Sequence, residues 1–312
     1  MFSLKCLRWF GPSTRRPPTM AVLQLGLPRG SYGANGRLSK SGGTAHASRP
    51  HARPSAGSKL CRSQAEEAAM RIAFISDIHA NFPALCKALE WAERHQADRV
   101  VCAGDIVGHG PHPTEVVRLL KEQAIQAVRG NVDRKVLTAL ESPKKLQKRL
   151  KKKSQAPAAW AALALGDAER AWLGSLPTEL RFTVEGSDVL VIHGSPLSDT
   201  DSIFPSITGP ALVAKLGESR PHVVVCGHSH IPFQRRIAGV RVVNCGSVGL
   251  PVDGDPRGAV ALCEFSGDRR VVCRMARFAF PVEPLVADVV SRGAKGASPQ
   301  EYRTGTKRAE EP

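Results

Sequence analysis

Three absences narrow the class of protein to which this chain can belong. The 312 residues contain no apolar run of 18 residues, so no membrane-spanning helix and no membrane partner are expected. No two of the eight cysteines have CxxC spacing, and most lie in apolar, strand-like runs. We therefore expect buried thiols in a reducing compartment, with the cytoplasm as the default, and neither a disulfide framework nor a cysteine zinc site. Aromatic residues make up only 5% of the chain, which leaves few platforms for stacking nucleic-acid bases.

Acidic residues are missing from the start of the chain. The first 65 residues contain eleven Lys and Arg, no Asp or Glu, and no sustained hydrophobic period, so residues 1–69 are predicted to be a disordered basic extension. Such a composition resembles an organelle transit peptide; the alternative, which we favour, is a disordered or wrongly annotated extension, with Met70 as the true start. Residues 291–312 are also predicted to be an unstructured tail. One domain over 70–290 remains.

The domain begins with apolar runs that alternate with helical periods. Runs over 71–75, 99–102 and 125–128 predict buried strands, with helices predicted over 84–94 and 114–123 between them. This βαβαβ pattern is typical of a parallel sheet.

Residues 134–178 interrupt this rhythm and are predicted to form a helical insertion. They include a basic run over 144–153. The run is either a patch for an anionic partner or, as we favour, a solvated helix face.

The second half of the domain is rich in strands. Residues 180–192, 234–244 and 259–274 are predicted to form hairpins, and 223–226 a single buried strand. The predicted fold class is α/β, with α+β character because the sheets mix parallel and antiparallel strands. It is a four-layer α-β-β-α sandwich of two mixed sheets, the second largely antiparallel, with the helical insertion beside the site.

Polar residues follow several predicted strands at the point where each ends. In an open α/β sheet these ends border the crevice in which ligands bind. The side chains offer oxygen and imidazole donors but no thiolate, which suits Mn²⁺, Fe, Zn²⁺ or Mg²⁺. Seven ligands are too many for one ion with an open position, but they suit two ions about 3.5–4 Å apart that share a carboxylate. The seven are Asp77, His79, Asp105, Asn131, His193, His228 and His230.

The order of these motifs resembles the calcineurin-like metallophosphoesterases, and among them the small bacterial phosphodiesterases. The resemblance covers Met70 to about Arg274. It rests on Asp77-x-His79, Gly104-Asp105, Gly130-Asn131-x-Asp133, His193-Gly194 and Gly227-His228-Ser229-His230.

The resemblance implies a dinuclear phosphoesterase in which Asp105 bridges two divalent ions and a metal-bridging hydroxide attacks phosphorus in line. Mn²⁺ is the expected metal, while Fe, Zn, Mg and Ni suit the same ligands. It assigns Asp77, His79, Asp105 and His230 to one ion, and Asp105, Asn131, His193 and His228 to the other.

Position 132 departs from the family pattern. Many members have His between the Asn and the acidic residue of the third motif, where it contacts substrate and can protonate the leaving group; here the residue is Val132. The resemblance therefore implies phosphodiesters rather than alkyl phosphomonoesters, or that another histidine serves as the acid. His109 and His112 are the nearest candidates, although we favour a solvated loop position for each. Asp133 either orients an imidazole or caps the next helix.

Three other functions stay open at this point. The first is a catalytically weak scaffold or protein-interaction module that keeps the fold. The second is a phosphomonoesterase or protein phosphatase. The third is a nuclease or nucleic-acid binder, which the low aromatic content disfavours. A small phosphate ester is the expected substrate, and the oligomeric state is left open.

Overall fold

The computed structural model describes residues 69–307, so the predicted basic extension lies outside the described residues, apart from Ala69. The first sheet has the strand order β10-β9-β1-β2-β3. Its parallel strands are β1 (Met70–Ile75), β2 (Arg99–Cys102) and β3 (Gln126–Ala127), and the antiparallel hairpin of β9 (Gly258–Ser266) and β10 (Arg270–Phe278) joins β1.

The second sheet has the order β4-β5-β6-β8-β7. It is less antiparallel than predicted, because β6 pairs in parallel with both of its neighbours, β5 and β8. A strand that is flanked in this way by parallel partners must be buried on both faces. Its five strands are β4 (Glu179–Val184), β5 (Ser187–Ile192), β6 (Val223–Cys226), β7 (Phe233–Ile237) and β8 (Val240–Asn244).

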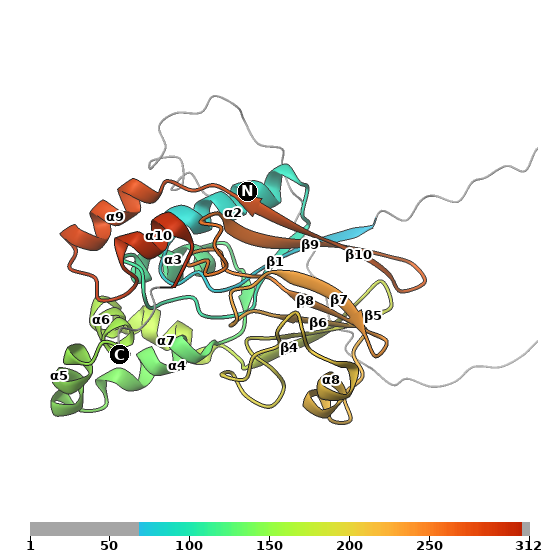
Figure 1. The fold of residues 1–312 in the computed structure, drawn as a ribbon, viewed down its shortest axis with the longest axis horizontal. Helices are drawn as coiled ribbons and strands as arrows, with labels where there is room; N and C mark the ends of the chain where they lie inside the picture. Colours follow the sequence, from blue (N-terminus) through green and yellow to red (C-terminus); the bar gives the residue numbers. More distant parts are fainter. Residues whose placement is uncertain (1–68, 308–312) are drawn as a thin grey trace, which may run out of the picture. The chain divides into compact units, whose positions relative to one another are not determined.

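The two sheets pack face to face, with helices outside both (Figure 1). Phe74 of β1, Val191 of β5 and Val225 of β6 belong to one buried cluster between the sheets. A larger cluster joins the outer face of the first sheet to α2 (Phe82–Arg94), α3 (Pro113–Glu122) and α9 (Val282–Ser291). A third joins the second sheet to α8 (Gly209–Leu216). These clusters confirm the predicted four-layer α-β-β-α sandwich, because residues of alternate parity on each strand enter different clusters.

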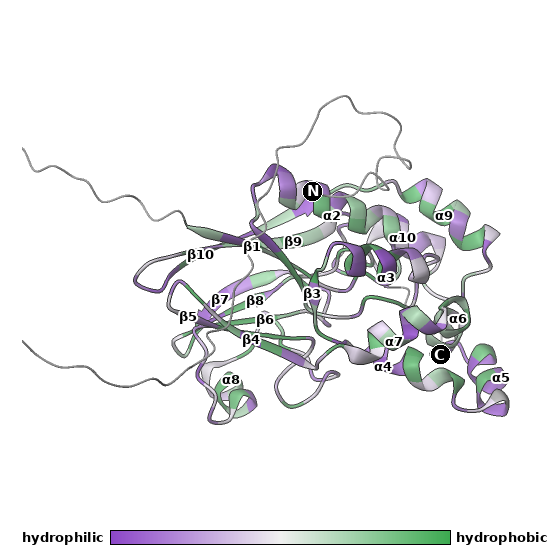
Figure 2. Cartoon of the chain, turned by 180° about the vertical axis from the view of Figure 1, so that it is seen from behind, coloured by the Kyte–Doolittle hydropathy of each residue, from purple (hydrophilic) through white to green (hydrophobic). Residues whose placement is uncertain are grey.

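Helices occupy the stretch for which the sequence predicts a helical insertion. They are α4 (Asn131–Leu137), the 3₁₀ turn η1 (Thr138–Leu140), α5 (Pro143–Lys151), α6 (Ala156–Ala164) and α7 (Asp167–Ser175). The lysines of the basic run are exposed on and just after α5, whose hydrophilic and hydrophobic segments alternate in Figure 2. Their exposure fits the solvated helix face that we favoured from the sequence.

The prediction of an unstructured tail from residue 291 is wrong for the described part. Helix α10 (Pro299–Thr304) begins with a capping box between Ser298 and Glu301 and buries Tyr302 completely. The Tyr302 hydroxyl donates to the His109 carbonyl oxygen at 3.2 Å. One buried aromatic ring and one cap hold this short helix in place. The hydrophobic pattern of the tail sequence is too weak to predict it.

Three of the described cysteines, Cys86, Cys263 and Cys273, are disulfide-bonded, which contradicts the expectation that all are thiols. Cys263 and Cys273 are direct cross-strand partners in the β9–β10 hairpin and form a disulfide. The hairpin register, which cysteine spacing alone does not show, brings them together. Cys102, Cys226 and Cys245 are buried thiols, as predicted. Cysteine usage therefore gives no support for a reducing compartment. None of the helices between residues 69 and 307 has the length and apolar character that a membrane crossing requires.

Candidate metal centre

The loops that follow five strands meet at one place between the two sheets. Asp77 and His79 follow β1, Asp105 follows β2, and Asn131 follows β3 as the first residue of α4. The first two loops are bound to each other, because the Asp77 amide donates to the Gly104 carbonyl at 2.9 Å and the His79 amide to that of Asp105 at 3.0 Å.

The second sheet supplies the remaining predicted ligands. His193 follows β5, and His228 and His230 follow β6. Parallel strands end at the same edge of a sheet, so this topology places the three imidazoles opposite the carboxylates of the first sheet.

Five of the seven predicted ligands have left-handed backbone conformations. Their φ angles are 52° for Asp77, 48° for His79, 51° for Asp105, 63° for His228 and 58° for His230. Such angles cost about 1–3 kcal/mol for each non-glycine residue and cluster where function fixes the backbone. The loops are therefore shaped to aim these side chains at one another, at a cost in stability.

Asp77, His79 and His230 form the first group of converging ligand atoms. The Nε2 atoms of the two imidazoles lie 3.1 Å apart, and Asp77 Oδ1 lies 3.2 Å from His230 Nε2. Because His230 Nδ1 donates to the Leu250 carbonyl at 2.5 Å, Nε2 of the neutral ring presents a lone pair to the site. A cation between these atoms would satisfy all three.

Asp105, His193 and His228 form the second group. His193 Nε2 lies 3.4 Å from Asp105 Oδ2 and 3.0 Å from Asn131 Oδ1, while its Nδ1 donates to the Ala103 carbonyl at 2.9 Å. In the neutral ring, Nε2 would thus be an acceptor facing two acceptors. Burial lowers the pKa of His193, but the charge and hydrogen bond of Asp105, together with the charge of Asp77, outweigh burial and raise it to about 10. A proton there supplies the positive charge that a metal ion would otherwise bring.

Asp105 stands between the two groups. Its Oδ2 lies 3.4 Å from His193 Nε2 and 3.7 Å from His79 Nε2, and its Oδ1 accepts from the Val132 amide at 2.8 Å. Burial raises the pKa of Asp105, yet the charge and hydrogen bond of His193 hold it well below its usual range. The carboxylate is therefore ionised and placed to serve both groups.

The donor set fits two divalent cations. Two buried carboxylates, an amide oxygen and four imidazoles converge without a thiolate, which is the chemistry that Mn²⁺, Fe, Zn²⁺ and Mg²⁺ accept. His79 Nδ1 is buried with no hydrogen-bond partner in the described part of the chain. A buried nitrogen without a hydrogen-bond partner destabilises the fold, as the left-handed backbone angles do, unless another interaction compensates for it.

Backbone carbonyls orient the imidazoles. Those of Ala103 and Leu250 fix His193 and His230, and that of Thr200 accepts from His228 Nε2 at 3.1 Å, which leaves His228 Nδ1 for the site. Because every residue has a backbone carbonyl, the sequence could not indicate that these three carbonyls orient the imidazoles.

Asp133 has the capping role that the sequence left as one of two alternatives. It accepts from the amides of Gly130 at 2.9 Å and of Ile106 and Val107 at 3.0 Å. It thereby caps α4 and ties that helix to the loop after Asp105. Burial, followed by the charge of Asp105, raises the pKa of Asp133 to about 7.

The two candidate acid histidines have different environments. The His109 ring packs edge-on against that of His79, with centroids 4.8 Å apart. The His112 ring is fully buried, and its Nε2 lies 2.9 Å from Asp288 Oδ2 on α9. The structure removes His112 as a candidate, because its side chain helps to attach α9. His109 lies at the site.

Val132 is buried and cannot donate a proton. A Cβ atom on Gly108 would come within 2.4 Å of Val132 Cγ1, so the side chain fills the space beside that glycine. Sequence reasoning missed one contact nearby. Arg134 of α4 makes a bidentate ion pair with Asp199, at 2.7 and 2.9 Å, next to the residue that orients His228.

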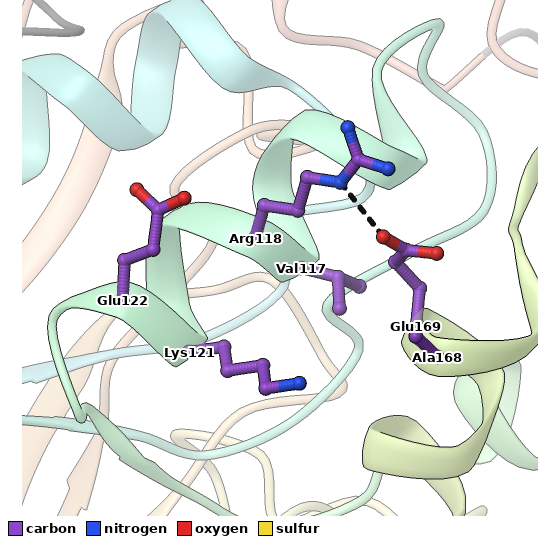
Figure 3. A pocket seen from close by; sticks show the side chains of 6 residues that line it. All are labelled: Val117, Arg118, Lys121, Glu122, Ala168 and Glu169. Atoms are coloured by element: carbon purple, nitrogen blue, oxygen red, sulfur yellow. Dashed lines mark hydrogen bonds and ion pairs between the residues drawn. The ribbon is translucent and has the colours of Figure 1, made fainter.

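A hollow between α3 and α7 is lined by side chains that form no metal-binding group. Arg118 and Glu169 line it and pair with each other, with 2.7 Å between Nε and Oε1 (Figure 3). It brings together no group of potential metal ligands.

Comparisons with known proteins agree with this geometry. An uncharacterized protein of Methanocaldococcus jannaschii is 30% identical over 200 residues, which cover 59% of this chain and 78% of that protein. The phosphodiesterase YfcE of Escherichia coli K12 is 27% identical over 197 residues, which cover 60% of this chain and 84% of YfcE. The crystal structure of a metallophosphoesterase from Sphaerobacter thermophilus has a TM-score of 0.63 at 26% identity and covers 76% of this chain and 100% of that one.

The family itself follows from a match over residues 70–268, well over half of the chain, to the calcineurin-like phosphoesterase superfamily domain. The chain belongs to the calcineurin-like phosphoesterase superfamily.

Proposed function

We propose that this protein is a dinuclear-metal phosphodiesterase that hydrolyses a small phosphate diester. The position of Asp105 carries the proposal, since one ionised carboxylate oxygen lies within 4 Å of an imidazole from each ligand group. Asp77, His79, Asp105 and His230 would hold one ion, and Asp105, Asn131, His193 and His228 the other. When bound, two such ions lower the pKa of water and neutralise phosphate charge.

The chain's own residues prepare the site for an anionic substrate. The carbonyls of Ala103, Leu250 and Thr200 fix the imidazoles, so the ligands need little reorganisation. His228 and His230 are partly exposed whereas the other five ligands are buried, so substrate enters from the side of the second sheet.

The preference for diesters rests on the absence of an acid at position 132. When the alcohol that a diester releases is acidic, it leaves as an anion without protonation. An alkyl monoester releases a poor leaving group and needs a proton donor at its leaving oxygen. Val132 offers none. Burial, partly offset by the charge of Asp105, lowers the pKa of His109 to about 4, so its ring is neutral at pH 7 and is a poor acid there. The similarity to a phosphodiesterase supports the same preference.

Reconstitution of the full chain tests the proposal. The chelated protein is loaded with Mn²⁺, Zn²⁺, Mg²⁺ or Fe²⁺, and each form is assayed on an aryl phosphodiester and on the matching monoester. We expect about two ions per chain, as in two-metal sites, with diesterase activity dominant. Asp167→Asn, on an exposed side chain, is the matched control. Dominant monoesterase activity would refute the diester preference, and a chain that binds no metal would be a scaffold.

A further inference from the structure

The end of the sheets opposite the metal centre carries a cleft lined by arginines. It lies where an edge strand of each sheet comes together, since β10 of the first sheet contacts β7 of the second. Figure 1 shows the tip of the β9–β10 hairpin projecting at this end. His222, which precedes β6, lines the cleft, whereas His228 follows β6 at the metal centre. At about 3.3 Å per residue of strand, the two sites are about 20 Å apart.

The charges in this cleft are unbalanced. Arg236, Arg241, Arg269 and Arg270 line it, with Asp268 as the one carboxylate among the lining residues. Within residues 69–307, none of the four arginines forms an ion pair. Elsewhere arginines such as Arg134, Arg181 and Arg257 are paired with carboxylates.

Two of the arginines face each other directly. Arg236 of β7 and Arg241 of β8 are cross-strand partners, so their side chains lie on the same face of the sheet. Like charges in this position repel each other and destabilise the pair. Burial, followed by the charge of Arg236, lowers the pKa of Arg241. An anion between the two guanidinium groups would remove the repulsion.

Two hydrogen-bond donors also meet at the cleft, with no acceptor between them among residues 69–307. The Asp188 amide donates to His222 Nδ1 at 2.8 Å, so the neutral ring carries its proton on Nε2. That Nε2 lies 3.3 Å from Arg269 Nη1, and a guanidinium nitrogen only donates. Both N–H groups therefore suit a shared oxyanion.

We propose that this arginine cleft binds the phosphate group of a small organic anion, at a site separate from the metal centre. Guanidinium groups match phosphate oxygens in charge and in hydrogen-bond geometry. The cleft volume of about 490 Å³ exceeds the need of inorganic phosphate and falls among ligand pockets of about 300–1,000 Å³. The site does not depend on the proposed diesterase activity.

Calorimetry on the full chain tests this proposal with inorganic phosphate and adenosine monophosphate as probes. Titrations are made at constant ionic strength set with chloride, on the metal-loaded chain and on the chelated chain. We expect binding in the cleft to survive chelation. The double variant Arg236→Gln/Arg241→Gln should weaken it at least tenfold, while metal content and hydrolysis stay unchanged. Arg274, which is exposed on β10 and lies outside the cleft, provides the matched control: Arg274→Gln should bind as the wild type does.

Comparing the affinities of the two probes shows which part of the anion the cleft recognises. Equal affinity for the two probes would assign recognition to the phosphate group alone, and tighter binding of the nucleotide would assign it to the whole ester. Unchanged affinity in the double variant would overturn the proposal. So would binding of RNA without either small probe, or binding of chloride as strong as that of phosphate.

A second measurement guards against misfolding of the variant. In the chelated wild type, the His222 Nε2 proton is followed by NMR as phosphate is added. A shift that saturates with the calorimetric affinity is expected, and an unmoved His222 signal would contradict the site.

Discussion

The two sheets contribute different kinds of ligand to the metal centre. The first supplies every oxygen donor, from Asp77, Asp105 and Asn131, together with the His79 imidazole. The second supplies imidazoles only. Both carboxylates thus lie on one side, and imidazoles alone lie on the other. Each of the two ligand groups contains members from both sheets, so the centre exists only when the sheets are packed together.

Removing the bridging charge should have the largest effect. Asp105→Asn leaves both ligand groups without their shared carboxylate, so we expect both ions to be lost together and hydrolysis to fall by about a thousandfold or more. Metal analysis and the aryl diester assay measure this, with Asp167→Asn as the control. Full activity in Asp105→Asn would refute the dinuclear centre.

Removing one imidazole of the second sheet should have a smaller effect on metal content. His230→Asn affects only the group with Asp77 and His79, so we expect one ion to be retained and activity to fall by about a hundredfold. Metal analysis of this variant beside Asp105→Asn is the measurement. Loss of both ions from His230→Asn would show that the two groups are not separable.

Position 132 tests whether the first sheet can also supply an acid. Val132→His restores the family's usual residue, and we expect the ratio of monoesterase to diesterase activity to rise by about tenfold. Val132→Leu, which adds bulk but no proton donor, is the control for the tight space beside Gly108. A ratio that stays the same in Val132→His would show that this position does not set the preference.

The contact between α4 and the loop after β5 should have the smallest effect. Arg134→Gln breaks the ion pair with Asp199 and frees the neighbouring Thr200 carbonyl that orients His228. We expect kcat to fall by less than the tenfold or more that is typical of partners bound directly to a ligand. Since the pair is partly exposed, the free energy of unfolding should fall by about 1 kcal/mol or less. If the free energy of unfolding fell while kcat stayed unchanged, the ion pair would have a structural role only.

The sequence predicted the layers and the convergence of the seven side chains because both follow from local patterns. Each apolar run ended at a polar residue, and strand ends on one edge of a sheet lie together, as His79 and Asp105 do. Local patterns could not separate His109 from His112, since the packing of α9 against the latter depends on a residue 176 positions away.

Pairings across long distances or hairpins stayed hidden for the same reason. The disulfide of Cys263 and Cys273 depends on the register of one hairpin. The arginine cleft depends on two hairpins from different sheets, and in the sequence its arginines resemble ordinary solvated charges. Backbone strain at Asp77 and His79 has no sequence signal, because neither residue is glycine.

Low-temperature electron paramagnetic resonance of the Mn²⁺-loaded full chain tests the central claim most directly. If Asp105 bridges two ions, the spectrum should show an exchange-coupled pair, and Asp105→Asn, which is expected to lose both ions, should show no coupled signal. A wild-type spectrum of isolated Mn²⁺ ions alone, at two ions per chain, would contradict a shared carboxylate and with it the dinuclear centre.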